Sequence, residues 1–308
     1  MNERPRASLD RPDVALGRSR MKRSIVVGGF SFLTVVVTAT ASAGTPAPRF
    51  NPPKSYYLAL GDSFSFGYQV TRLSAPPDPV AFDHGFVDDL GVSLRQIAPA
   101  ITTVNYGCPG ESTSTFIEGG CPWLAAGYAL HDSFTGSQLD AAVGFLRAHP
   151  GEISPITISV VLNDVQQFIA DCAFEPLCIQ KGAPATTHQI TTNLATILER
   201  LRRAAPNVEI IVLGPYDPFI GNLEFADPLF MALNDAMAET VASASARYAD
   251  IFPSFNPQGD IDAETSTLCM LTLWCSFGDG HPSDLGYQVM ADAIFEVSGY
   301  QRLLDGET

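Results

Sequence analysis

The sequence predicts a three-layer α/β/α sandwich, in which a parallel sheet of about five strands lies between two layers of helices. Strand-like and helix-like segments alternate about five times along the chain. The strand-like segments are apolar at almost every position, which is typical of parallel strands covered by helices on both faces. No internal repeat and no low-complexity segment interrupts this order.

The expected strands are short apolar runs that end at turn residues. Gly61, Gly107 and Gly214 follow three of these runs, and glycine commonly ends a regular element. The third run instead continues into Asn163 and Asp164. The five runs comprise residues 56–60, 101–106, 155–162, 208–213 and 248–252.

The expected helices are segments in which apolar residues recur three or four positions apart. Residues 187–205 show this spacing most clearly. Ser137 with Asp140 is typical of a capped helix start, and so is Pro282 with Ser283. The other expected helices comprise residues 83–97, 138–149, 227–247 and 284–298.

The first 43 residues are typical of a segment that is removed on export. A basic stretch at 21–24 precedes an apolar run at 25–38, and Ala41-Ser42-Ala43 has the small residues after which a signal peptidase cuts. The run is shorter than the roughly 20 residues that a membrane-spanning helix needs. We therefore expect a signal peptide over residues 21–43 and a secreted protein without a stable membrane span. A retained N-terminal anchor is the alternative.

Residues 1–20 are Arg-rich and precede the natural start at Met21, so we exclude them from the fold. Residues 44–308 then suit one single domain. They carry 11 Lys and Arg against 30 Asp and Glu, because seven of the 18 basic and three of the 33 acidic residues precede them. Such an acidic surface repels phosphate backbones and anionic lipid headgroups, so nucleic acid is an unlikely fit as a partner.

All six cysteines lie in the part expected to be exported, where an even number favours disulfides. Several pairings are possible, and pairing in sequence order is favoured because close partners meet most often. None of the spacings is Cys-x-x-Cys, so neither a redox motif nor a zinc knuckle is indicated. The expected pairs are Cys108 with Cys121, Cys172 with Cys178, and Cys269 with Cys275.

Ser63 is the candidate nucleophile of the predicted sheet. Ligands of open parallel sheets bind beyond the carboxyl ends of the strands, and Gly61-Asp62-Ser63 follows the first strand. Asp62 is expected to cap the turn. A serine hydroxyl needs an adjacent base, and His281, in a loop before the last helix, has the suitable context. The other histidines (His84, His131, His149 and His188) are expected to be structural or solvated.

Four short segments resemble the sequence blocks of the SGNH/GDSL hydrolase family. Residues 57–64 (YLALGDSF) resemble the first block, with Phe64 where the family name has Leu, and residues 105–113 (NYGCPGEST) resemble the second. Residues 161–164 (VLND) resemble the third block, Gly-x-Asn-Asp, and residues 279–282 (DGHP) resemble the last, Asp-x-x-His-Pro. The blocks occur in family order and span nearly the whole expected domain.

The resemblance implies a flavodoxin-like fold and acyl transfer from an ester through a covalent Ser63 intermediate, with His281 as general base. It implies an oxyanion hole formed by Gly110, Asn163 and the Ser63 amide. No metal or cofactor takes part in such a reaction. A Cys108–Cys121 bridge would stiffen the oxyanion loop.

Two positions depart from the family pattern. Val161 replaces the usual glycine of the third block. Asp279 precedes His281 by two residues instead of three, and Gly278 occupies the expected place of the acid. Either the Asp279 carboxylate or the Gly278 carbonyl is therefore expected to orient His281.

The predicted function is that of a secreted, monomeric carboxylic-ester hydrolase, an esterase or lipase acting on a small-molecule or lipid ester. The alternatives are a polysaccharide deacetylase and a non-catalytic cell-envelope binding protein on a degenerate hydrolase scaffold. Phe64, Phe66 and Tyr68 either line an acyl pocket or pack in the core. The loops at about 66–82, 214–226 and 253–280 are expected to decide the substrate, but their sequences do not indicate it.

Overall fold

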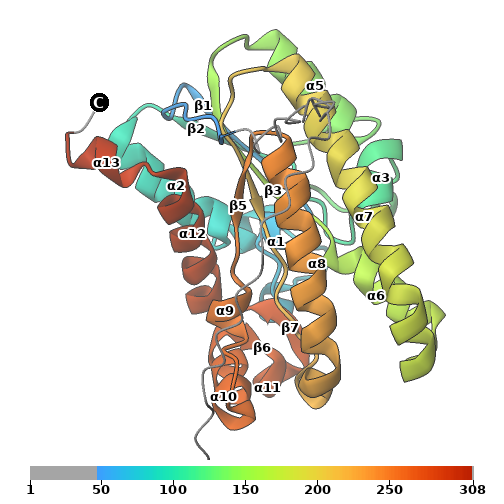
Figure 1. The fold of residues 1–308 in the computed structure, drawn as a ribbon. Coiled ribbons are helices and arrows are strands. Elements are labelled where there is room, and N and C mark those ends of the chain that lie inside the picture. The colour runs from blue at the N-terminus through green and yellow to red at the C-terminus, as the bar shows by residue number, and fades with distance from the viewer. Residues whose placement is uncertain (1–46, 307–308) are drawn as a thin grey trace, which may run out of the picture. The chain divides into compact units, whose positions relative to one another are not determined.

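A computed structural model of the chain describes residues 47–306 (Figure 1). These residues belong to one compact unit. The expected signal peptide at 21–43 and the extension at 1–20 lie outside the described residues. Within residues 47–306, no helix combines the length and the apolar character that crossing a membrane requires.

Five parallel strands form the central sheet, in the spatial order β2-β1-β3-β4-β5. This confirms the predicted fold class. The order places β1 beside β3, so the residues that follow these two strands meet at one edge of the sheet. The strands are β1 (Tyr56–Gly61), β2 (Thr102–Asn105), β3 (Ile153–Ser159), β4 (Ile210–Leu213) and β5 (Arg247–Ala249).

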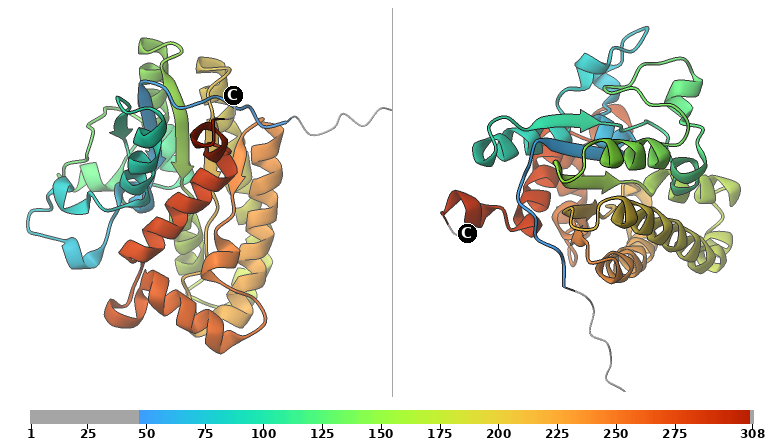
Figure 2. Two further views of the ribbon diagram at one scale, coloured as in Figure 1. Left: turned by 90° about the vertical axis from the view of Figure 1, so that its left-hand side faces the viewer. Right: turned by 90° about the horizontal axis from the view of Figure 1, so that it is seen from above.

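Helices cover both faces of the sheet. In Figure 1, α2 (Phe86–Ile97) and α12 (Asp284–Ser298) lie to the left of the sheet, and α5 (Gln138–Ala148), α7 (Pro176–Ala204) and α8 (Leu223–Ser243) lie to the right. The right-hand view in Figure 2 shows α7 and α8 side by side.

Alternate residues of each strand face the two helical layers. In β1, Tyr57 and Ala59 belong to the core that includes α2 and α12, whereas Leu58 and Leu60 belong to the core that includes α5 and α7. Successive side chains of a strand point to opposite faces, and all four are fully buried. The continuous apolar character of the strands therefore reflects burial on both sides.

The shorter elements lie mostly around the carboxyl end of the sheet. They are α1 (Ser63–Phe66), α3 (Thr113–Glu118), α4 (Pro122–Ala125), α6 (Leu162–Asp171), α9 (Phe252–Phe255), α10 (Ile261–Leu271), α11 (Trp274–Phe277) and α13 (Gln301–Leu304), with 3₁₀ turns at Val70–Arg72, Pro79–Phe82 and Ile220–Asn222. A separate antiparallel pair is formed by β6 (Thr272–Leu273) and β7 (Asp279–Pro282).

The largest difference from the expected elements follows β3. The strand ends at Ser159, not at residue 162, and α6 begins almost at once. Helix α7 begins at Pro176, not near residue 187, and continues through Gly182 and Pro184. Glycine and proline have low helix propensity, so the sequence did not favour a helix there. Pro184 is exposed, and packing of α6 against α7 stabilises this part of the helix.

Three disulfides join the six cysteines in sequence order, as expected: Cys108–Cys121, Cys172–Cys178 and Cys269–Cys275. The first closes the segment that follows β2. The second links the end of α6 to the first turn of α7. The third links α10 to α11. Each bridge therefore stabilises a connection between elements near the carboxyl end of the sheet.

Candidate active site

Ser63 is the first residue of α1, directly after the end of β1. The Asp62 carboxylate caps this helix by accepting a hydrogen bond of 2.9 Å from the Phe64 amide. Gly61 permits the close approach of β1 and β3, because a side chain there would lie 2.0 Å from the Ser159 carbonyl oxygen. The turn thus places the Ser63 hydroxyl at the wall of a cavity at the sheet edge.

His281 and Asp279 approach Ser63 from β7. The distance from Ser63 Oγ to His281 Nε2 is 2.9 Å, and that from His281 Nδ1 to Asp279 Oδ1 is 2.5 Å. The three side chains form a continuous hydrogen-bonded chain, although Ser63 and His281 are 218 positions apart in sequence. Of the two partners expected for His281, the structure places the Asp279 carboxylate in contact with the ring.

Two backbone amides hold the Asp279 carboxylate in addition to the imidazole. The Val70 amide donates to Oδ2 at 3.0 Å, and the His281 amide donates to Oδ1 at 3.1 Å. Burial acts to raise the pKa of Asp279, but these bonds and the His281 ring outweigh it, so the pKa lies below its usual value. The carboxylate is therefore ionised at neutral pH and can stabilise a protonated imidazole.

Gly110 and Asn163 line the same cavity as Ser63 and His281. Asn163 stands in the first turn of α6, and its Nδ2 donates to the Glu111 carbonyl oxygen at 2.9 Å. This bond ties α6 to the loop that carries Gly110. Val161 has a φ of 177°, an extended backbone that any residue adopts, so this position does not require the family's glycine.

Gln138 and Glu111 brace the site beneath the loop that carries Gly110, and sequence reasoning did not single them out. Gln138 Oε1 accepts from the Gly61 amide at 2.6 Å. Its Nε2 donates to the Gly61 carbonyl at 2.9 Å and to Glu111 Oε2 at 3.1 Å. A glutamine at the start of a helix gives no signal of this role, since the contact spans 77 positions.

Three carboxyl groups lie around this edge of the sheet: Asp62 and Glu111 are buried, and Asp164 is half-buried. Burial raises the pKa of Asp62 to about 7 and the pKa of Glu111 to about 7. Burial also raises the pKa of Asp164, opposed by hydrogen bonds from the Thr113 amide and hydroxyl at 2.9 Å and 2.6 Å. The bonds to Asp164 fix α6 against the start of α3.

The cavity has a volume of about 500 Å³. Phe64 and Tyr68 line it, whereas Phe66 packs in the core against Phe82. Phe64 is also a buried member of the core, where it stacks on Tyr216, so it fits both of the expected possibilities. Tyr68, Phe219 and Trp274 also line the cavity, and they come from the three loops expected to decide the substrate. Trp123 lines it as well, from a segment that was not among those loops.

His281 is the one histidine of the five that lines this cavity. His131 hydrogen-bonds the Phe66 carbonyl and pairs with Asp83, and His149 packs between Tyr56 and Phe145. His84 and His188 are exposed.

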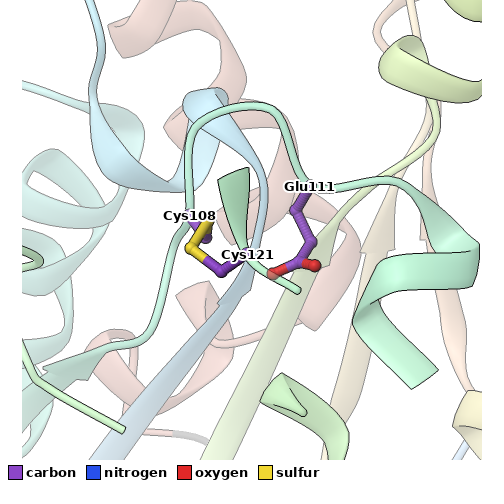
Figure 3. Close-up of side chains that lie close together, drawn as sticks. All are labelled: Cys108, Glu111 and Cys121. Atoms are coloured by element: carbon purple, nitrogen blue, oxygen red, sulfur yellow. A yellow bond between two sulfur atoms is a disulfide. The ribbon is translucent and has the colours of Figure 1, made fainter. Parts of the chain in front are cut away.

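Cys108, Glu111 and Cys121 lie together beside the loop that carries Gly110, close enough for a shared metal ion (Figure 3). The two sulfur atoms are bonded to each other, however, so neither is available as a thiolate ligand. One carboxylate cannot hold an ion by itself, and the cluster is a structural brace.

Comparisons with known proteins agree with this architecture. The family model of the GDSL-like Lipase/Acylhydrolase family matches residues 59–289. A lipase from a goat rumen metagenome has a similar structure, with a TM-score of 0.54 and 18% identity over 80% of this chain and 99% of its own. A protein described as a GDSL-like lipase, from Parabacteroides merdae, is also similar in structure. Its TM-score is 0.55, and its sequence is 18% identical over 82% of this chain and 99% of its own.

A variant of an acetyl xylan esterase from Geobacillus stearothermophilus is also similar, with a TM-score of 0.50 and 18% identity over 81% of this chain and 96% of its own. No curated protein matches the sequence. At these identities the solved structures show the fold, and the match to the family model covers most of the chain. The chain therefore belongs to the GDSL-like lipase/acylhydrolase family of hydrolases.

Proposed function

We propose that this hydrolase is a secreted serine carboxylic-ester hydrolase, with Ser63 as nucleophile, His281 as general base and Asp279 as the acid that orients His281. The observation that carries the proposal is the hydrogen-bonded chain from Ser63 Oγ through the imidazole to Asp279. Nucleophile, base and orienting carboxylate in contact are the arrangement that activates a serine hydroxyl.

The first half of the reaction acylates Ser63. His281 Nε2 takes the hydroxyl proton as Oγ attacks the ester carbonyl, and Asp279 stabilises the imidazolium that forms. His281 then gives this proton to the leaving alcohol as the carbon–oxygen bond breaks. In the second half, water attacks the acyl group with His281 again as base, which releases the acid and restores Ser63.

The oxyanion of each tetrahedral intermediate is held by the backbone amides of Ser63 and Gly110 and by the Asn163 side chain. An amide nitrogen of asparagine carries two hydrogens, and one of them is donated to the Glu111 carbonyl. That bond leaves the second hydrogen for the oxyanion and fixes its direction. The reaction needs no metal and no cofactor.

We further propose that residues 21–43 are a signal peptide and that residues 44–308 act as a monomeric domain outside the cell. The three disulfides support this proposal, because such bonds persist in oxidising compartments. Mass determination of the protein purified from the culture medium tests it: a chain that begins near Gly44 is expected, and an uncleaved chain would contradict it.

Labelling with a fluorophosphonate tests the catalytic proposal against a non-catalytic binding protein. We expect the wild-type protein to be labelled and Ser63→Ala to remain unlabelled. Ser65→Ala, a serine of the same helix that bonds the Leu60 carbonyl, is the matched control and should keep its label. Labelling of Ser63→Ala, or none of the wild type, would contradict the proposal. Hydrolysis of p-nitrophenyl esters beside an acetylated xylan separates an esterase from a deacetylase.

A further inference from the structure

A second cavity of about 260 Å³ lies next to the active-site cavity. Its walls come from α6, the N-terminal half of α7, the turn at Ile220–Asn222 and the start of α8. These elements follow β3 and β4, the two strands beside each other in the sheet. The expected substrate-deciding loop at 214–226 supplies part of the lining.

Helix α6 forms the partition between the two cavities. Leu162, Asn163 and Gln166 line the active-site cavity, whereas Val165, Phe168 and Ile169 line the second one. Asn163 and Gln166 share one face of α6, and Val165, Phe168 and Ile169 share the adjacent face, with Leu162 at the boundary between them.

Phe219 lines both cavities, from the segment that follows β4. Its aromatic ring is thus a shared wall between the space around Ser63 and the space behind α6. A flexible chain bound to Ser63 would have to pass this residue to reach the second cavity.

The lining of the second cavity is mostly apolar. It includes Phe168, Ile179, Phe225 and Phe230, and none of the described residues that line it carries a charge. Phe174 also lines it and is 70% exposed. Thr186, Thr187 and Asn222 are the polar residues of this lining, so a sugar or a charged group bound here would lose most of its hydrogen bonds to water. Each buried methylene would instead contribute about 0.8 kcal/mol. The chemistry therefore fits a hydrocarbon chain.

We propose that the second cavity binds the distal part of the substrate's acyl chain, which makes the protein an acylhydrolase of long-chain esters. This inference rests on the proposed role of Ser63. The helix that presents Asn163 to the carbonyl oxygen also forms the partition to the second cavity, on the carbonyl side of the ester. The leaving alcohol must lie against His281 on β7, and no residue of β7 or α11 lines the second cavity.

The test fills the cavity from α7. Ala183 lines it and is half-buried, whereas Ala185 is exposed on the same helix and does not line it. Ala183→Trp should lower kcat/KM for p-nitrophenyl palmitate about tenfold or more relative to p-nitrophenyl acetate, because it removes space for several methylenes. Ala185→Trp, the matched control, should leave this ratio unchanged.

Each outcome bears on the proposal. An unchanged ratio in a folded Ala183→Trp protein that hydrolyses the acetate would overturn the acyl-chain site while leaving the esterase intact. If Ala183→Trp loses activity on hexadecyl acetate and keeps it on the palmitate ester, the cavity binds the alcohol and the proposal is overturned. If the wild type hydrolyses no ester, the proposed function fails.

A binding measurement keeps the cavity testable without catalysis. Ser63→Ala should bind cis-parinaric acid, a fluorescent fatty acid, with an increase in its emission. The double variant with Ala183→Trp should lose this binding, and the double variant with Ala185→Trp should keep it. Equal binding by both double variants would overturn the proposed location of the chain.

Discussion

Asp279 and His281 stand two residues apart on strand β7, and the Asp279 carboxylate Oδ1 lies 2.5 Å from His281 Nδ1. Alternate side chains of a strand point to the same face, which lets an acid at this short spacing reach the ring. The family pattern places the acid three residues before the histidine. In this chain the extended backbone of β7 makes the shorter spacing productive.

Asp279→Asn should lower kcat at neutral pH by up to about 10⁴-fold, because the amide no longer holds the imidazole in its working tautomer or stabilises its charge. Steady-state hydrolysis of p-nitrophenyl acetate measures the loss. Asp284→Asn is the matched control, since this carboxylate pairs with Arg72 and does not contact His281. Turnover of Asp279→Asn near the wild-type rate would show that another group orients His281.

Asn163→Ala should lower kcat by about 100- to 1,000-fold, the usual effect of removing one oxyanion donor. The KM should change less than kcat, because the donor acts mainly on the transition state. Gln166→Ala, from the same helix and the same cavity, serves as the control and should retain most of its turnover. Equal losses in the two variants would remove Asn163 from the oxyanion hole.

Glu111→Gln should flatten the dependence of stability on pH. Burial raises the pKa of Glu111 from 4.5 to about 7 in the folded protein, so the folded state keeps a proton that the unfolded chain releases. The contribution of this group to the free energy of unfolding therefore falls as the pH rises from about 4.5 to about 7, and is constant above that range.

Denaturant unfolding at several pH values measures this effect. The decline over that range should be shallower in Glu111→Gln than in the wild type, by an amount of the order of 3 kcal/mol. Glu118→Gln changes an exposed carboxyl group at the end of α3 and should reproduce the wild-type profile. A variant at Glu111 with the same decline as the wild type would contradict the inferred proton on this group.

Replacement of Cys108 and Cys121 by alanine should lower the free energy of unfolding by about 3 kcal/mol, the value for a loop of this size. It should also reduce turnover, because the bridge holds the loop that carries Gly110. The double replacement of Cys172 and Cys178 opens a shorter loop and should cost less stability. Thermal unfolding and ester hydrolysis are measured for both variants. Unchanged turnover without the Cys108–Cys121 bridge would show that the bridge is not needed to hold the loop that carries Gly110.

The positions of Ser63, Gly110, Asn163 and His281 could be inferred from the sequence because each signal is local. Three of these residues follow strands, and the carboxyl ends of parallel strands share one edge of a sheet. Helix α6 could also have been recognised, since Leu162, Val165, Phe168 and Ile169 recur at helical spacing. It was missed because the apolar strand pattern was extended through residue 162.

The N-terminal half of α7 had no such local signal. Gly182 and Pro184 both disfavour a helix. A side chain at residue 182 would lie 2.6 Å from the Phe168 ring, so glycine permits the close packing of α6 on α7. Tertiary packing overrides local propensity here, and the apolar cavity exists because of it.

By itself the sequence determined the layered α/β class, the five strands and the longer helices between them, the sequential disulfides and the candidate nucleophile and base. These features depend on residue spacing and on neighbours close in the chain. Only the tertiary structure decided that Asp279 contacts His281, that Gln138 joins Gly61 to Glu111 and that α6 separates two cavities. The Gln138 contacts and the two cavities depend on segments far apart in sequence, which strand order and helix packing bring together. The contact of Asp279 with His281 depends on the strand conformation of β7.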